Sequence, residues 1–135
     1  MHERILIVAA EQQNGRMREL LTQQGFVVTI FDDANAAYDE LLRSEFNLVI
    51  VNLSHLTEGQ DLIKRIRAKA EPGPISILAI GEWGSGQPTM ALIQGADAFE
   101  PAPVDDERLL AAVAKLMRPK LTMIARASAV DADPD

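Results

Sequence analysis

Cysteine is absent from this chain of 135 residues, which excludes disulfide frameworks, thiolate nucleophiles and thiolate metal sites. Aromatic residues are scarce as well: they make up 4% of the chain against 47% for all hydrophobic residues, so a core must consist mainly of aliphatic side chains. No apolar run approaches the ~20 residues that a membrane-spanning helix needs, and the first run is too short for the core of a signal peptide. We therefore expect a globular protein in the cytoplasm, without contact with a membrane.

Basic residues are outnumbered, with 13 Lys and Arg against 20 Asp and Glu, which gives a net charge of −7. Nucleic-acid binding requires a clustered positive field that neutralises phosphates, so this balance argues against a nucleic-acid partner. One local exception lies on a predicted helix that carries Lys64, Arg65, Arg67 and Lys69. These four side chains are interpreted as a solvated helix face, with a contact for an acidic partner as the alternative.

Short apolar runs alternate with amphipathic stretches along most of the chain. The runs predict strands at 5–8, 27–31, 48–51, 75–80 and, more weakly, 98–99. Apolar residues at the 3.6-residue period predict a helix after each of them. The strict alternation predicts an α/β fold, a doubly wound five-stranded parallel sheet with helices on both faces, or (βα)5 sandwich. We assign this domain to residues 1–117, and residues 118–135, which begin near a helix-breaking Pro119, to a linker or tail.

Several blocks of sequence, in their order and spacing over about residues 3–117, resemble the receiver domains of response regulators in two-component signalling. The blocks are "ILIVAAE", "GFVVTIFDDANAAYDELL", "NLVIVNLSHLTEGQDLIKRIR", "QGADAFEPAP" and "DDERLLAAVAKLM". The resemblance implies a flavodoxin-like, CheY-like fold and a bacterial-type signalling role. It also implies a chemistry, in which a phosphoryl group is transferred to an aspartate at the carboxyl edge of the sheet.

In that family an acidic pair after the first strand holds Mg²⁺, an aspartate after the third strand attacks phosphorus, and a Thr or Ser and a Lys grip the phosphoryl oxygens. The resemblance places other residues at every one of these positions. They are Ala9 and Ala10 at the acidic pair, Asn52 at the acceptor, Ala79 or else Ile80 at the hydroxyl, and Ala102 at the lysine. Phe99 stands at the aromatic switch position, without a phenolic oxygen.

These replacements predict a pseudo-receiver: a domain that is not an enzyme, holds no metal or other cofactor, and works without phosphorylation. The Ala102–Pro103 bond is predicted to be cis, because it stands where the family commonly has a cis peptide. Two rival functions remain open. One is a small-ligand sensor that uses the emptied pocket between Ala9, Asn52, Ala79 and Ala102. The other is an enzyme with relocated chemistry, for which Glu11, Asp32 and Glu82 are the candidate groups.

Other motifs are interpreted as structural. The glycine-rich loop at 81–88 lacks the order of a phosphate-binding loop and is read as a flexible connector, with Trp83 partly buried or in contact with a partner. His55 has no second histidine nearby, Glu58 and Asp61 suit the first turn of a helix, and Ser54 has no visible triad partner.

The helix expected around residue 91 carries more apolar residues than its position requires. Ala91 and Leu92 match inward-facing positions, whereas Met90 and Ile93 fall where family members usually carry outward polar residues. Either the helix is slightly rotated, or Met90 and Ile93 form an exposed patch of the kind that marks an interface. The second reading predicts a protein partner or a homodimer that binds through the face from the fourth to the fifth helix.

Overall fold

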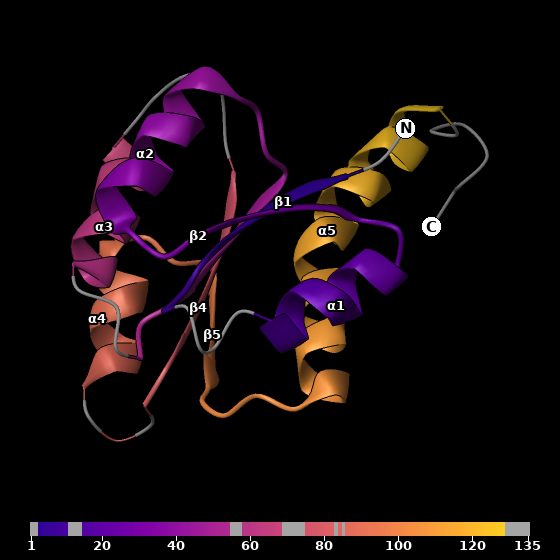
Figure 1. Cartoon of the computed structure of the whole chain (residues 1–135). Helices are drawn as coiled ribbons and strands as arrows, with labels where there is room; N and C mark the ends of the chain where they lie inside the picture. The colour runs from indigo at the N-terminus through magenta and orange to yellow at the C-terminus, as the bar shows by residue number, and fades with distance from the viewer. Residues whose placement is uncertain are drawn as a thin grey trace.

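The computed structural model describes residues 3–10, 15–54, 58–68, 75–82, 84 and 86–128. Strands and helices alternate within them as the sequence predicts (Figure 1). The elements are β1 (Arg4–Val8), α1 (Gly15–Gln23), β2 (Val27–Phe31), α2 (Ala34–Arg43), β3 (Leu48–Asn52), α3 (Gly59–Ala68), β4 (Ser76–Gly81), α4 (Gln87–Gln94), β5 (Ala98–Pro101) and α5 (Asp106–Ser128).

The strands form one parallel sheet in the order β2-β1-β3-β4-β5. Because the order reverses between β1 and β3, the carboxyl ends of these two strands flank the switch point at which such folds bind ligands. Figure 1 shows α2, α3 and α4 on one side of the sheet and α1 and α5 on the other. The predicted doubly wound, CheY-like fold is confirmed.

Successive side chains of each strand enter different halves of the core. In β1, Leu6 and Val8 pack with α2 and α3, whereas Ile5 and Ile7 pack with α1 and α5. All five residues of β3 are buried, as a central strand covered on both faces requires. Each buried Val, Leu or Ile contributes about 1.5–3 kcal/mol, so these two aliphatic half-cores hold the sheet together despite the scarcity of aromatic residues.

The ends of two helices have local causes. Asp33 caps α2, because its Oδ2 accepts a hydrogen bond from the Ala36 N–H at 3.1 Å. Gly95 ends α4 with φ of 126°, a conformation that favours glycine. The expectation that Pro119 ends the last helix is wrong: α5 continues to Ser128, since a proline inside a helix removes one hydrogen bond and can kink a helix without ending it. A helix able to cross a bilayer is not found in the described part of the chain.

Arg67 joins three segments at the amino edge of the sheet. Its guanidinium donates to the carbonyl of Gly95 at 2.9 Å, to the carbonyl of Ile75 at 3.0 Å and to Asp97 Oδ2 at 2.8 Å. Asp97 Oδ2 also accepts the N–H of Ile77 at 2.7 Å. We call these five residues the Arg67 cluster. It ties α3 to the end of α4 and to the first residues of β4 and β5.

The predicted basic face of α3 is therefore only partly solvated. Arg67 serves the cluster, and Arg65 donates to Asn35 Oδ1 at 2.9 Å while lying 4.2 Å from the centroid of the Tyr38 ring. Lys64 is exposed, and Lys69 lies outside the described residues. Two of the four cations thus hold neighbouring elements in place.

Candidate functional site at the carboxyl edge of the sheet

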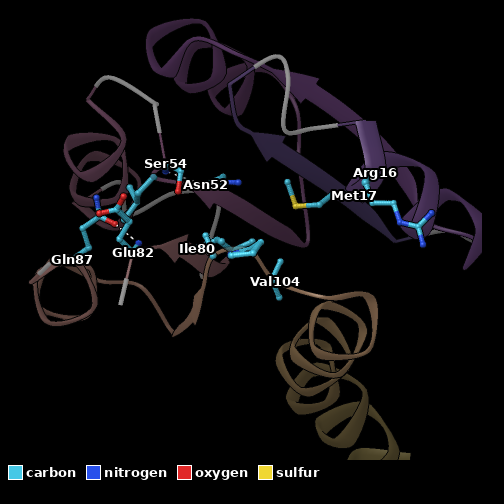
Figure 2. Close-up of a pocket in the computed structure, with 11 residues that line it drawn as sticks. Arg16, Met17, Asn52, Ser54, Ile80, Glu82, Gln87 and Val104 are labelled. Atoms are coloured by element: carbon cyan, nitrogen blue, oxygen red, sulfur yellow. Dashed lines mark hydrogen bonds between the residues drawn. The ribbon is translucent and has the colours of Figure 1, made fainter. Parts of the chain in front are cut away.

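A cavity of about 560 Å³ opens at the carboxyl edge, where the sequence predicts the site (Figure 2). Its walls come from α1, the end of β3, the end of β4 with the start of α4, and the segment after β5. The lining residues are Arg16, Met17, Asn52, Leu53, Ser54, Ile80, Glu82, Gln87, Ala102, Pro103 and Val104. Segments far apart in sequence meet here because all strands are parallel and end at one edge.

Asn52 is the last residue of β3 and is only 7% exposed. Its Oδ1 accepts the N–H of Ser54 at 3.0 Å, an Asx-type turn that fixes the side chain as the chain leaves the strand. Asn52 pairs in register with Ile80 of β4. Figure 2 shows the Asn52 amide nitrogen turned away from Ser54 and toward the cavity. The residue at the acceptor position is thus a fixed, uncharged amide.

The cavity does not lie between the four residues expected to bound it. Asn52 and Ala102 line it, but Ala9 is fully buried in the half-core of α1 and α5. Ala79 is fully buried in the opposite half-core, where Ala91 also lies. The reason is the alternation of side chains along a strand, which turns Ala79 away from the cavity and its neighbour Ile80 toward it. Of the two residues considered for the hydroxyl position, Ile80 is the one at the cavity.

Two further predicted site positions do not line the cavity. Ala10, two residues after the end of β1, is half-buried, and Phe99 of β5 is half-buried and pairs in register with Ala79. The Ala102–Pro103 bond is cis, as predicted.

Gln87 belongs to the site, although no sequence pattern selects it. Its Oε1 accepts the N–H of Glu82 at 2.7 Å, and a Cβ on Gly81 would overlap this oxygen. The same Cβ would lie 3.3 Å from Cζ of Phe99. Glycine at the end of β4 therefore lets the first residue of α4 fold back over the strand. This contact anchors one side of the loop that we interpreted as a flexible connector; Trp83 lies outside the described residues.

Arg16 is the cation at the cavity rim, and its charge is already offset. Its Nε donates to Asp106 Oδ1 at 3.2 Å, Nη2 makes a closer contact with Asp106 Oδ2, and Nη1 lies 3.3 Å from Glu19 Oε1. The hydrogen bonds and charge of Asp106 raise the pKa of Arg16 above its usual value. Arg16 thus bridges α1 and the start of α5 with a guanidinium that two carboxylates share.

The described residues do not fit a magnesium site of the receiver type. Such a site needs several hard oxygen ligands, whereas Ala9 and Ala10 offer methyl groups and the Asn52 Oδ1 already accepts a hydrogen bond. Groups of three or more His, Asp or Glu residues that could hold a metal are not found among the described residues.

Of the three candidates for relocated chemistry, Glu82 lines the cavity and Asp32 does not, while Glu11 lies outside the described residues. His55, which the sequence showed without a second histidine, lies outside them as well. The assignment of Glu58 to a first helical turn is wrong, because α3 begins at Gly59 and Glu58 has a left-handed φ of 65°. Asp61 does lie in the first turn of α3, as expected.

Helix α4 exposes three apolar side chains. Met90 is 43% exposed, Leu92 49% and Ile93 71%, and we call these three residues the α4 patch. The reading of a rotated helix that buries Met90 and Ile93 is therefore wrong. The prediction of an inward Leu92 is wrong as well, because only Ala91 faces the sheet, and the next residue lies about 100° further around the helix.

Comparisons with known proteins point to one family. The chain is 37% identical over 101 residues to the transcriptional regulatory protein FixJ of Bradyrhizobium diazoefficiens, a match that covers 73% of this chain and 48% of FixJ. It is 34% identical over 116 residues to the response regulator ArlR of Staphylococcus epidermidis, with 84% of this chain and 52% of ArlR covered. The chain thus spans about half the length of these relatives.

A crystal structure of a response regulator from Chloroflexus aurantiacus superimposes with a TM-score of 0.79. The superposition covers 87% of this chain and 99% of that one at 20% sequence identity, so it shows the same fold. No protein-family model matches the chain.

Proposed function

Because the chain carries a response-regulator receiver domain of the CheY-like type, we propose that it is a pseudo-receiver, which passes on a signal through protein contacts and without phosphorylation. In this proposal the domain is a non-enzymatic interaction or dimerisation module of a two-component type of signalling system. The observation that carries the proposal is the state of Asn52.

A receiver needs an anionic oxygen that attacks phosphorus at the end of its third strand. Asn52 has the shape of aspartate but a neutral amide, whose oxygen is a poor nucleophile and already accepts the Ser54 N–H. Phosphoryl transfer also depends on cations that offset the negative charge of the transferred group. Ala102 supplies none at the lysine position, and Arg16 shares its charge with Asp106 and Glu19. Nucleophile, metal ligands and lysine are thus replaced together.

The α4 patch supports an interaction role. Met90 and Ile93 are three residues apart and therefore neighbours on the surface of the helix. Exposed apolar side chains that lie together are typical of protein interfaces, because leaving them in water costs free energy that a partner would recover. On β5 and α5, next in sequence, Glu100 Oε1 and Arg108 Nη2 form an ion pair at 3.0 Å. A surface that combines the apolar side chains of α4 with the charged ones of β5 and α5 is suited to bind a second copy of the domain or another protein.

Phosphorylation is tested by incubating the chain with Mg²⁺ and acetyl phosphate and measuring its intact mass. The proposal predicts an unchanged mass, also for the variant Asn52→Asp, which regains the carboxylate but neither the metal ligands nor the lysine. A stoichiometric acyl phosphate on the natural chain would contradict the proposal.

The interaction surface is tested by the double variant Met90→Glu with Ile93→Glu, analysed by light scattering and by pull-down from the source cell. We expect loss of self-association or of a bound partner, without loss of the folded far-ultraviolet circular dichroism. Leu42→Glu is the matched control, because Leu42 is 55% exposed on α2, outside the proposed face. Assembly and capture that are identical in both variants would show that the face is wrong.

A further inference from the structure

The cavity at the carboxyl edge has an extended apolar wall. Met17 and Ile80 form its buried part, with exposed fractions of 5% and 0%, and Ala102 and Val104 continue it toward the opening. Figure 2 shows Met17, Ile80 and Val104 grouped together, at a distance from the polar residues Glu82 and Gln87. A volume of about 560 Å³ lies within the range of about 300–1,000 Å³ that is typical of small-molecule sites.

A hydrogen-bond donor opens into the cavity beside this wall. Asn52 as a residue is 93% buried, and its carboxamide oxygen is used by the Ser54 N–H, whereas its Nδ2 has no hydrogen-bond partner within the described part of the chain and points toward the cavity (Figure 2). Polar groups in largely buried sites are nearly always paired with protein, water or a ligand, so this amide NH2 group is suited to an acceptor atom that enters the cavity.

The charges around the cavity favour an uncharged molecule. The Arg16 guanidinium is engaged by Asp106 and Glu19, so an incoming anion would have to compete with two carboxylates and would also meet Glu82. Among the described residues that line the cavity, the acidic one is the exposed Glu82, because Ala9 and Ala10 stand where a receiver has its acidic pair, so a cation meets little negative charge. Transfer of any unpaired charge from water to the apolar wall is costly.

We propose that the cavity binds an uncharged small organic molecule with an apolar body and a carbonyl or amide oxygen, which accepts a hydrogen bond from Asn52 Nδ2. The apolar body lies against Met17, Ile80 and Val104. Ligand binding of this kind goes beyond signalling through protein contacts. Ligand binding does not depend on the absence of phosphorylation. The proposal of a ligand site and the proposal of a pseudo-receiver can therefore be contradicted independently.

The test uses three probes of nearly equal shape: benzamide, which is neutral, benzoate, which is anionic, and benzylamine, which is cationic. Each is titrated into the labelled full chain while nuclear magnetic resonance follows the Asn52 side-chain amide and the Ile80 and Val104 methyl groups. We expect saturable shifts with benzamide at a Kd on the order of 1 mM, as suits a fragment of this size. Benzoate and benzylamine should bind about tenfold more weakly or not at all.

Two variants and one control decide the geometry. Asn52→Leu keeps the size of the side chain and removes the donor, and should weaken benzamide about tenfold. If that variant does not fold, Ala102→Leu, which fills part of the cavity, should weaken benzamide instead. The double variant Met90→Glu with Ile93→Glu changes the α4 patch only and should leave the Kd unchanged. Equal affinity for the three probes, no saturable shift, or full affinity in the cavity variants would overturn the proposal.

Discussion

At the amino edge of the sheet the Arg67 guanidinium donates to three acceptors. At the carboxyl edge, within the described part of the chain, the side chain of Asn52 makes one hydrogen bond, to the backbone two residues ahead. The amino edge is tied further by the Arg4 N–H, which donates to Asn47 Oδ1 at 2.7 Å and joins the starts of β1 and β3. At the amino edge a single side chain thus connects three segments, whereas at the cavity Asn52 binds only its own loop, and the Arg16–Asp106 pair that joins α1 to α5 lies at the exposed rim.

If the proposed function is right, this difference explains how a receiver fold persists without its reactive site. The catalytic groups of a receiver would lie at the carboxyl edge, so replacing them with alanine and asparagine leaves the contacts of the amino edge and both half-cores intact. Carboxylates clustered at one edge also repel each other unless a cation is present, so their joint removal avoids an uncompensated charge. We therefore expect the stability of the domain to depend more on the amino edge than on the carboxyl edge, and this can be tested.

The largest effect is expected at Arg67. Arg67→Met removes three hydrogen bonds and leaves Asp97 without its cation, so the free energy of unfolding should fall by about 2–4 kcal/mol. Urea unfolding measures the loss. Lys64→Met on the same helix is the control and should change stability by less than about 0.5 kcal/mol. If the two variants were equally stable, the amino edge would not have the role that we assign to it.

Gly95 at the end of α4 is the next most sensitive position. A Cβ there would lie 2.8 Å from Cβ and Cγ of Arg67, and φ is 126°, so Gly95→Ala should cost about 2–3 kcal/mol. Gly25 has φ of 95° but no atom within 4 Å of such a Cβ, so Gly25→Ala should cost about 1 kcal/mol, for the backbone alone. Thermal unfolding of the two variants separates the cost of close packing from the cost of backbone strain. A larger loss of stability in Gly25→Ala than in Gly95→Ala would contradict the packing described for Arg67.

A negative charge introduced at Asn52, at the carboxyl edge, should lower the free energy of unfolding relative to the natural amide. In Asn52→Asp the new carboxyl is buried without a cation, which raises its pKa in the folded state above the value of about 3.9 in the unfolded chain. The variant should match the natural chain below about pH 4 and lose about 1–2 kcal/mol as pH rises through the raised pKa. Stability measured from pH 4 to 8 checks this, and a loss that is the same at every pH would point to a cause other than charge.

The smallest effect is expected at Arg16. Its ion pairs with Asp106 and Glu19 are exposed, and exposed pairs contribute little because water and salt screen them. Arg16→Met should therefore lower the Tm by much less than Arg67→Met, and added salt should reduce the difference from the natural chain. An equal loss of Tm in both arginine variants would remove the contrast between the two edges.

The order of elements could be predicted from the sequence because buried parallel strands are continuous apolar runs and the helices between them are amphipathic. The location of the cavity could also be predicted, since the carboxyl ends of parallel strands meet at one edge, and two of the predicted residues, Asn52 and Ala102, line it. These inferences need only local periodicity and the resemblance of a few blocks.

The remaining features depend on tertiary contacts that no local pattern encodes. The sequence of α4 does not decide which of its apolar residues faces the sheet. In the structure Ala91 is the buried residue of this helix, and Leu92 is exposed as a consequence. The direction of Ala79 and Ile80 depends on the register of β4, in which a shift of one residue exchanges the two faces. Gln87 enters the site because Gly81 leaves space for its side chain. In the sequence Arg67 is one of four cations on the same helix, and its role follows only from its contacts with Gly95 and Asp97, which are distant in sequence.

The most direct test of phosphorylation-independent signalling is the amide nuclear magnetic resonance spectrum of the chain before and after addition of Mg²⁺ and acetyl phosphate. A functional receiver would couple its carboxyl edge to α4, so the informative signals are those of the α4 patch and Phe99. We predict that the two spectra superimpose and that the intact mass is unchanged. Shifts in the α4 patch together with an acyl phosphate on the chain would contradict the claim that this edge no longer takes part in phosphoryl transfer.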